Sequence, residues 1–338
     1  MAPACSATTW SAPVPGVSRR PLALALLALA GALAVALSLA VGSVPIRGAE
    51  LWAVLTGGGD PLHRELLLSL RLPRALAAFA TGGLLGLAGA LMQVLLRNPL
   101  ADPYVLGLSG GAAVGALGAM LLGGAAVWVP GAAFVGALLS TVLVFGLAQG
   151  VGGWTPTRLL LTGVVVAAGW GAVVTFLLTL SPAERLPGML YWLMGDLSYA
   201  RSPWPAWLLL VPAALLVLPL GRGLNVLARG PLQAASLGVA VRPLEITVYV
   251  LASALTAMAV STAGSVGFVG LVVPHMLRLA LGNDQRLILP ASVLAGGALL
   301  TLADTLARTL LAPQQLPVGV ITALLGVPTF LLLLYRSR

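Results

Sequence analysis

The chain is a series of long apolar stretches separated by short breaks that are polar or rich in glycine and proline. Most stretches approach the roughly 20 residues that an α-helix needs to cross a bilayer, and only the eighth is clearly shorter. The pattern therefore predicts ten transmembrane helices, at residues 21–42, 72–96, 103–123, 130–150, 158–180, 203–220, 243–263, 266–281, 288–310 and 316–335.

The composition supports a membrane protein and excludes a soluble one. Of the 338 residues, 59% are hydrophobic and 8% are charged, whereas about a quarter of an ordinary globular domain is charged. The predicted fold class is an all-α membrane protein with a tail at residues 1–20 and one transmembrane domain at residues 21–338. The first apolar run is too long for a signal-peptide core of about 7–15 residues, so we expect it to remain as a helix.

The distribution of arginine predicts that both termini are cytoplasmic. In that orientation the cytoplasmic segments carry eleven arginines and the outer segments carry seven, which follows the positive-inside rule. The longest loops, 43–70 and 181–202 outside and 221–242 inside, are too short for a soluble catalytic domain. The net charge of +9 is spread over loops and helix ends, so it does not indicate nucleic-acid binding.

The residue types that are rare or missing exclude several kinds of site. All 18 basic residues are arginine, and a nucleotide-binding P-loop requires a lysine, so this chain carries no P-loop ATPase. One cysteine, Cys5, and two distant histidines, His63 and His275, do not form a metal-ligand cluster. We expect no catalytic residue, no resident metal and no cofactor.

Two alternative functions have partial support in the sequence. An ion-coupled secondary transporter needs a titratable residue within the membrane, but the spacing of Asp304 and Arg308 suits an i,i+4 ion pair near a helix end. An intramembrane serine protease could use Ser109, in a G-x-S-G tetrad, with His275 as the base. Both alternatives stay open at this point.

Four segments are specific in combination. They are R-L-P-R at 71–74, N-P-L-A-D-P at 98–103, G-F-V-G-L-V-V-P-H at 267–275 and L-P-V-G-V-I-T-A-L-L-G-V-P at 316–328. Together they resemble the FecCD-type permeases, which are membrane subunits of bacterial ABC importers for iron siderophores, haem or cobalamin. The resemblance extends from about residue 20 to the C-terminus.

The resemblance implies the architecture of a type II ABC importer permease in the bacterial inner membrane. It implies a homodimer, a cytoplasmic ABC ATPase dimer that hydrolyses ATP, and a periplasmic substrate-binding protein. The implied activity is import of an iron chelate or a corrinoid, such as vitamin B12, from the periplasm to the cytoplasm. The motifs are common to all these permeases and leave the substrate open.

The resemblance also assigns a docking surface for the binding protein. The arginines of R-L-P-R and of A-D-x-x-A-R match Arg71, Arg74 and Arg308. In the family these arginines pair with glutamates of the binding protein. An alternative role is to anchor helix ends, with an internal Asp304–Arg308 pair.

A second assigned site is the coupling segment for the ATPase, at about 224–242. Gly230-Pro231 suits a helix start and Leu237-Gly238 a helix stop, which predicts a short helix at about 231–237. The alternative is a surface turn that contacts no other protein. The residues matching the family's coupling element are Gln233, Ala234, Ala235, Ser236, Leu237 and Gly238.

The third assigned site is the translocation pathway, which the family forms from the fifth and tenth helices and from loop 181–202. The loop resembles W-L-M-G-S-L-S, with Asp196 where serine is commoner. The aromatic residues of the loop could instead belong to an interfacial belt. The candidate lining residues are Thr162, Thr175, Thr179, Met194 and Thr322.

Overall fold

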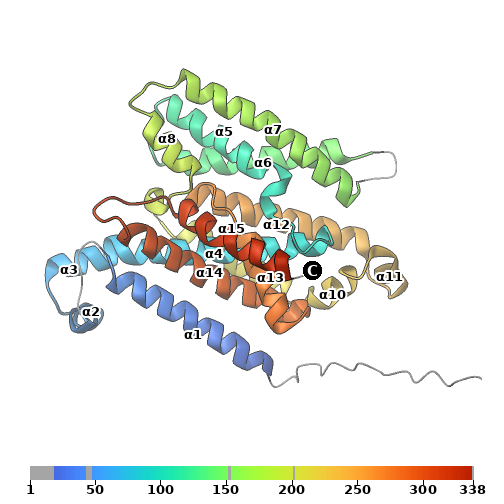
Figure 1. Ribbon diagram of the computed structural model, residues 1–338, viewed down its shortest axis with the longest axis horizontal. Coiled ribbons are helices and arrows are strands. Elements are labelled where there is room, and N and C mark those ends of the chain that lie inside the picture. The colour runs from blue at the N-terminus through green and yellow to red at the C-terminus, as the bar shows by residue number, and fades with distance from the viewer. Residues whose placement is uncertain (1–18, 43–47, 151–153, 201, 337–338) are drawn as a thin grey trace, which may run out of the picture.

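The computed structural model describes residues 19–42, 48–150, 154–200 and 202–336, and within these ranges all regular structure is helical (Figure 1). The predicted fold class is confirmed. The predicted N-terminal tail lies almost wholly outside the described residues.

Each predicted transmembrane segment contains a helix. Six helices are long and apolar enough to cross a membrane, and α9 with α10 forms a seventh candidate that is bent by 71°. The shorter apolar helices α5, α13 and α15 occupy the other three segments. The bounds are α1 Arg19–Ala40, α4 Leu72–Leu95, α5 Leu108–Leu121, α6 Trp128–Ala148, α7 Pro156–Leu180, α9 Trp204–Val217, α12 Val241–Ala263, α13 Val269–Leu281, α14 Gln285–Thr309 and α15 Val318–Arg336.

The three predicted loops contain short helices, which hydropathy alone did not indicate. The side chain of Asp60 accepts a hydrogen bond from Leu62 N and caps the first of two helices that continue directly into α4. The short helices lie within the segments 43–70, 181–202 and 221–242, which the hydropathy pattern predicted to be loops. Their bounds are α2 Gly48–Leu55, α3 Pro61–Glu65, a π-helical turn Leu66–Arg71, α8 Leu186–Leu193, α10 Gly221–Leu227 and α11 Pro231–Ser236, with 3-10 turns at Pro103–Leu106 and Leu197–Tyr199.

Helix α4 is the centre of the bundle and packs against α9, α12, α13 and α14. Its glycines allow α14 to approach at backbone distance. A Cβ atom on Gly82 would lie 2.1 Å from the carbonyl oxygen of Gly296, and one on Gly86 would lie 2.2 Å from that of Ser292. Small residues four apart therefore set the distance between the two helices.

Helices α5, α6 and α7 form a second group, which joins the rest mainly through α12 (Figure 1). Alanines at the α5–α6 contact, such as Ala112 and Ala133, are fully buried. In contrast, α7 lies at the periphery and buries only Leu159 and Gly163. The structure therefore leaves most of α7 uncovered.

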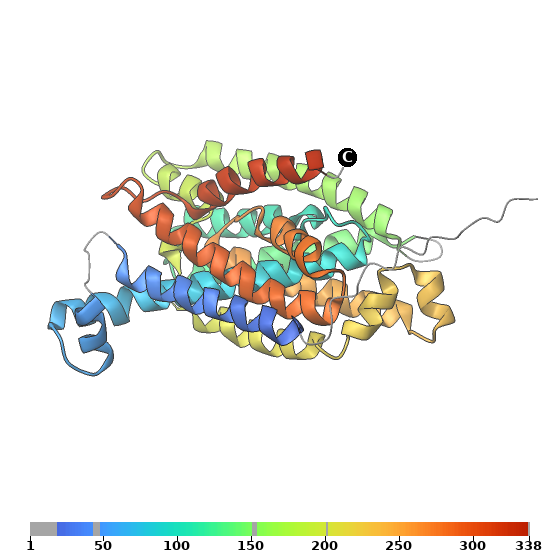
Figure 2. The same cartoon turned by 60° about the horizontal axis from the view of Figure 1, so that its bottom comes forward.

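Helices α1, α4 and α14 run lengthwise through the molecule and place short helices at its two ends (Figures 1 and 2). Helices α2 and α3 lie at one end, and α10 and α11 lie at the other. By the arginine distribution, the α2–α3 end is the predicted outer side. The candidate docking and coupling residues are consequently at opposite ends of the bundle.

Candidate docking, coupling and pathway sites

The three candidate docking arginines come together at the α2–α3 end. Arg71 and Arg74 flank the start of α4, and Arg308 is in the last turn of α14. Pro73 has no N–H to donate to the carbonyl of Ser69, and the π-helical turn lies just before it. Residues that are more than 200 positions apart in the sequence thereby form one cluster.

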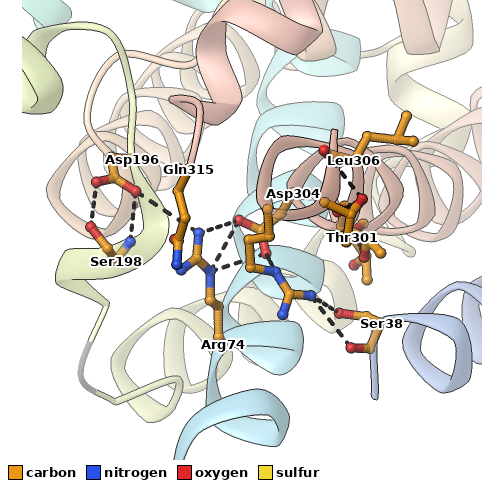
Figure 3. Close-up of polar contacts among 11 residues, drawn as sticks. Ser38, Arg74, Asp196, Ser198, Thr301, Asp304, Leu306 and Gln315 are labelled. Atoms are coloured by element: carbon orange, nitrogen blue, oxygen red, sulfur yellow. Dashed lines mark hydrogen bonds and ion pairs between the residues drawn. The ribbon is translucent and has the colours of Figure 1, made fainter. Parts of the chain in front are cut away.

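Asp304 is the centre of this cluster and its side chain is fully buried (Figure 3). Arg74 Nε donates to both carboxylate oxygens at 3.1 Å, and Arg74 Nη2 donates to Oδ1 at 2.9 Å. Arg308 Nε lies 3.1 Å from Asp304 Oδ2, the predicted i,i+4 ion pair. Two guanidiniums thus share one carboxylate, and this compensates for its burial.

The same arginines also bind neighbouring elements. Arg308 Nη2 donates to Ser38 Oγ on α1 at 2.8 Å, and Arg74 Nη1 donates to Gln315 Oε1 at 3.0 Å. Arg71 Nη1 donates to the carbonyl of Leu39 at 2.8 Å. Arg71 and Arg308 are only 7% and 8% exposed. The cluster therefore ties α1, α4 and α14 together, which agrees with the alternative role of these arginines as anchors of helix ends.

Asp196 approaches the cluster from the loop after α8. Its Oδ1 lies 4.0 Å from Arg74 Nη2 and accepts a hydrogen bond from Ser198 N at 2.9 Å, while Oδ2 accepts from Ser198 Oγ (Figure 3). A cavity of about 530 Å³ opens beside these groups, and Arg71, Arg74 and Arg308 all line it. The cavity presents three cations and could accept an incoming carboxylate.

The coupling segment forms a helix close to the predicted bounds. Gly230 has φ +126 and precedes Pro231, and Gly238 has φ +79 after the helix, a left-handed backbone that glycine adopts without strain. Ala234 is fully buried, whereas Gln233, Ala235, Ser236, Leu237 and Gly238 are exposed. Helix α11 thus projects from the α10 end with one face uncovered (Figure 1).

Leu232 belongs to this uncovered face but was absent from the residues chosen from the sequence. It is 87% exposed, and Leu237 at the other end of α11 is 64% exposed. The sequence feature that could have identified Leu232 is its position directly after Pro231, which starts a helix in a predicted inner loop. Two exposed leucines on one short helix are suited to burial against another protein.

The candidate pathway residues are divided between exposed and buried positions. Thr175 and Thr179 are exposed on α7, Thr162 is partly buried, and Met194 is 39% exposed. Thr322 is buried, and its hydroxyl donates to the carbonyl of Gly319 on α15. In this structure Thr322 therefore does not share an open surface with the α7 threonines.

The loop after α8 is packed against the start of α15. Gly319 N donates to the carbonyl of Gly195 at 3.3 Å, and a Cβ on Gly319 would lie 2.0 Å from the Met194 carbonyl oxygen. Trp192 is only 2% exposed, so it packs in the core rather than in an interfacial belt. The structure brings the loop and the tenth predicted helix together, as a shared pathway requires.

The residues of the two alternative functions have other partners. The hydroxyl of Ser109 shares a hydrogen bond with that of Ser265 at 2.9 Å, so this contact does not pair it with a base. Asp304 is buried, but it is already in ion pairs with two arginines, Arg74 and Arg308. Among the described residues there is no group of three histidine, cysteine or acidic side chains that could hold a metal ion.

Comparison with known proteins gives one consistent result. The model of the FecCD transport family matches residues 27–336. The cobalamin import system permease BtuC of Halobacterium salinarum is 44% identical over 83% of this chain and 76% of its own length. The hemin transport system permease HmuU of Yersinia pestis is 40% identical over 88% and 90%.

A solved structure agrees with these relatives. It is described as an inward-facing conformation of a metal-chelate type ABC transporter and superposes with a TM-score of 0.83 at 30% sequence identity. The superposition covers 94% of this chain and 99% of that one.

Proposed function

Because this chain belongs to the FecCD transport family, we propose that it is the permease subunit of an ATP-driven importer for an iron chelate or a corrinoid. The observation that carries the proposal is the family match over residues 27–336, together with a helix in every predicted span. Relatives named for hemin and cobalamin import support both substrate classes. Residues 21–338 form the one transmembrane domain that each copy of the chain contributes.

The energy source is a separate protein, since a chain without lysine has no P-loop. We assign a cytoplasmic ABC ATPase dimer as that partner, a periplasmic binding protein as the donor of substrate, and a second copy of this chain as the other half of the pathway. The complex resides in the bacterial inner membrane with both termini cytoplasmic. The excess of arginine at the α10–α11 end supports this orientation.

The outer cavity is the proposed docking site for the binding protein. A carboxylate that enters it meets Arg71, Arg74 and Arg308, which are already fixed by Asp304 and by backbone carbonyls. Fixed guanidiniums lose little side-chain entropy when they bind a carboxylate. Such pairs steer the encounter and fix the orientation of the two proteins.

Helix α11 is the proposed contact with the ATPase. Its exposed face from Leu232 to Gly238 is short and carries Gln233 and the small residues Ala235 and Ser236 between two leucines, so it can enter a cleft on another protein. The buried Ala234 attaches the helix to the rest of the molecule. A push on α11 is then transmitted to α10 and α12, which it contacts.

The pathway is proposed to run along α7, the loop after α8 and α15, between two copies of the chain. Thr162, Thr175, Thr179 and Met194 would provide mildly polar contacts, and Thr322 would contribute only after α15 shifts. Among the described residues no metal-ligand group is available to hold bare iron, so iron would travel inside its chelate.

The test is uptake in bacterial cells that lack their own permeases of this type and carry this chain with its operon partners. Labelled cobalamin, iron siderophore and haem are offered separately. We expect accumulation of one of them, and loss of accumulation when the P-loop lysine of the partner ATPase is replaced. Accumulation that survives this replacement would contradict ATP-driven import, and accumulation of none would contradict the substrate classes.

A further inference from the structure

A second and larger cavity is lined mostly by residues outside the docking, coupling and pathway sites, although Asn225, Ala228 and Arg229 belong to the coupling segment. Its volume is about 780 Å³. Its lining residues come from the α10–α11 end of the bundle, where α4 and α13 end and α1 and α14 begin; Figure 2 shows these helix ends. Its lining contains four arginines, Arg20, Arg97, Arg229 and Arg278, and a single acid, Asp284. Such a surplus of cations needs a counter-charge.

The single acid in the lining, Asp284, already has two arginine partners. Asp284 forms ion pairs with Arg20 at 2.9 Å and with Arg286 at 3.0 Å. Burial opposes its ionisation, but hydrogen bonds from Arg286 and Asn225 outweigh burial and lower the pKa of Asp284 to about 2. The carboxylate is therefore charged at every physiological pH and saturated with partners.

The other three arginines have no ion pair among the described residues. Glu245, on α12, interacts electrostatically with Arg97 and Arg242 but does not pair with either. Arg278 is held in place by its bonds to Gln93 Oε1 and, at 3.4 Å, to the carbonyl of Ala90. Gln93 is itself fixed, because its Nε2 donates to the carbonyl of Leu271. The cavity thus contains a preset guanidinium with unused donors, beside Arg97 and Arg229.

The position of the cavity defines what kind of anion can reach it. It opens at the ends of membrane helices, which is the depth of phospholipid headgroups. Exposed leucines lie close in sequence to the lining residues: Leu22 and Leu26, near Arg20 and Ala23 on α1, are 60% and 57% exposed, and Leu279, between Arg278 and Ala280 on α13, is 65% exposed. Residues 1–18 contain no acid that could neutralise the arginines.

We propose that this cavity binds the phosphate of an anionic phospholipid, with Arg97, Arg229 and Arg278 as the phosphate ligands. Basic cavities between membrane helices are a known kind of headgroup site, and arginine suits phosphate because its donors form a planar fork. The acyl chains would lie along the exposed leucines of α1 and α13. A soluble phosphate compound would not use this apolar flank.

The test uses the delipidated permease–ATPase complex in detergent, with bound lipid counted by native mass spectrometry. Phosphatidylglycerol, phosphatidylcholine and inorganic phosphate are titrated separately. We expect phosphatidylglycerol to bind and the Arg97→Gln/Arg229→Gln double variant to bind it about 25-fold more weakly, since each arginine near an anionic surface contributes about fivefold. Neither arginine is in an ion pair within the described chain, so the fold does not depend on them.

The matched control is Arg158→Gln, which removes an exposed arginine at the start of α7, outside the cavity. It should bind phosphatidylglycerol like the wild type. Equal binding of phosphatidylcholine, or unchanged binding by the double variant, would overturn the proposal. Competition by equimolar inorganic phosphate would assign the cavity to a soluble phosphate instead. Binding by the isolated permease that is lost in the complex would assign it to the ATPase interface.

Discussion

At the scale of single residues, two acids near Arg74 have different roles. Asp304 is fully buried, accepts hydrogen bonds from Arg74 and forms an ion pair with Arg308, so it builds the cluster. Asp196 is 9% exposed, lies 4.0 Å from Arg74 Nη2 and accepts hydrogen bonds from Ser198. A separation of 4.0 Å is too long for a hydrogen bond, so this contact holds Arg74 less firmly than the bonds from Arg74 to Asp304 do. Asp196 therefore places a negative charge beside the cavity, and its hydrogen bonds cap only the turn Leu197–Tyr199.

This difference predicts that Asp196→Ser strengthens docking of the binding protein. The substitution removes a negative charge that competes with the incoming carboxylate for Arg74, so the Kd should fall about two- to fivefold. The measurement is a titration of labelled binding protein against the permease complex in nanodiscs, at low salt. The matched control is Glu65→Ser, which removes an exposed acid at the same end of the bundle. An unchanged or higher Kd for Asp196→Ser would contradict the docking site.

Substituting the arginines themselves is a weaker test of docking. Removal of Arg74 or Arg308 leaves the buried carboxylate of Asp304 with one partner fewer, and breaking a buried pair costs about 3–5 kcal/mol. Lost docking would then have two explanations, a missing contact or a disturbed outer end. Asp196 avoids this ambiguity because its own contacts are with its loop.

At the scale of elements, α11 is a short helix whose outer face has no partner within the described chain. We predict that Leu232→Ser weakens association of the ATPase about tenfold or more, because full burial of a leucine is worth about 1.5–3 kcal/mol. The thermal unfolding temperature should not change, since the side chain is 87% exposed. The measurement is ATPase binding to the permease in nanodiscs, together with a thermal scan.

Leu122 is the matched control for this prediction, because it is 88% exposed and lies after α5, at the opposite end. Leu122→Ser should leave ATPase binding unchanged. If both variants bind the ATPase like the wild type, α11 is a surface turn without a partner. If both bind it weakly, the loss reflects a general effect of removing exposed leucine.

The elements that the sequence predicted are those decided by local patterns. Long apolar runs predicted the ten helices to within a few residues, and glycine and proline predicted both ends of α11. Helices α2, α3, α8 and α10 were missed, since a short helix is stabilised by packing rather than by its own sequence. The contact between Arg74 and Asp304 was also missed, because 230 positions separate them in the chain. The exposure of Leu232 could not be predicted from the sequence either, because it depends on which neighbouring helices pack against α11.

At the scale of the whole molecule, burial is uneven. Helix α4 is enclosed on all sides, whereas α7 and α15 carry large exposed apolar side chains such as Phe176 at 62% and Leu324 at 66%. Contact with lipid alone would explain why these apolar side chains are exposed. Thr175 and Thr179 change the picture, because they place exposed hydroxyls one turn apart on α7, although each also bonds to its own backbone. A face of this mixed kind suits a water-filled pathway between two copies.

The pathway proposal predicts that a cysteine introduced on this face of α7 is accessible to water. In a Cys5→Ser background, Thr175→Cys should react with a membrane-impermeant maleimide, because the reactive thiolate forms only where water can solvate it. Val135→Cys on α6 is the matched control: Val135 is 54% exposed and lies at a similar distance from the outer helix ends, so its thiol should stay in lipid and unreactive. The transported substrate should slow the reaction at Thr175→Cys and leave the control unchanged. If Thr175→Cys is as unreactive as Val135→Cys in the assembled complex, this face of α7 contacts lipid and the cargo must cross elsewhere.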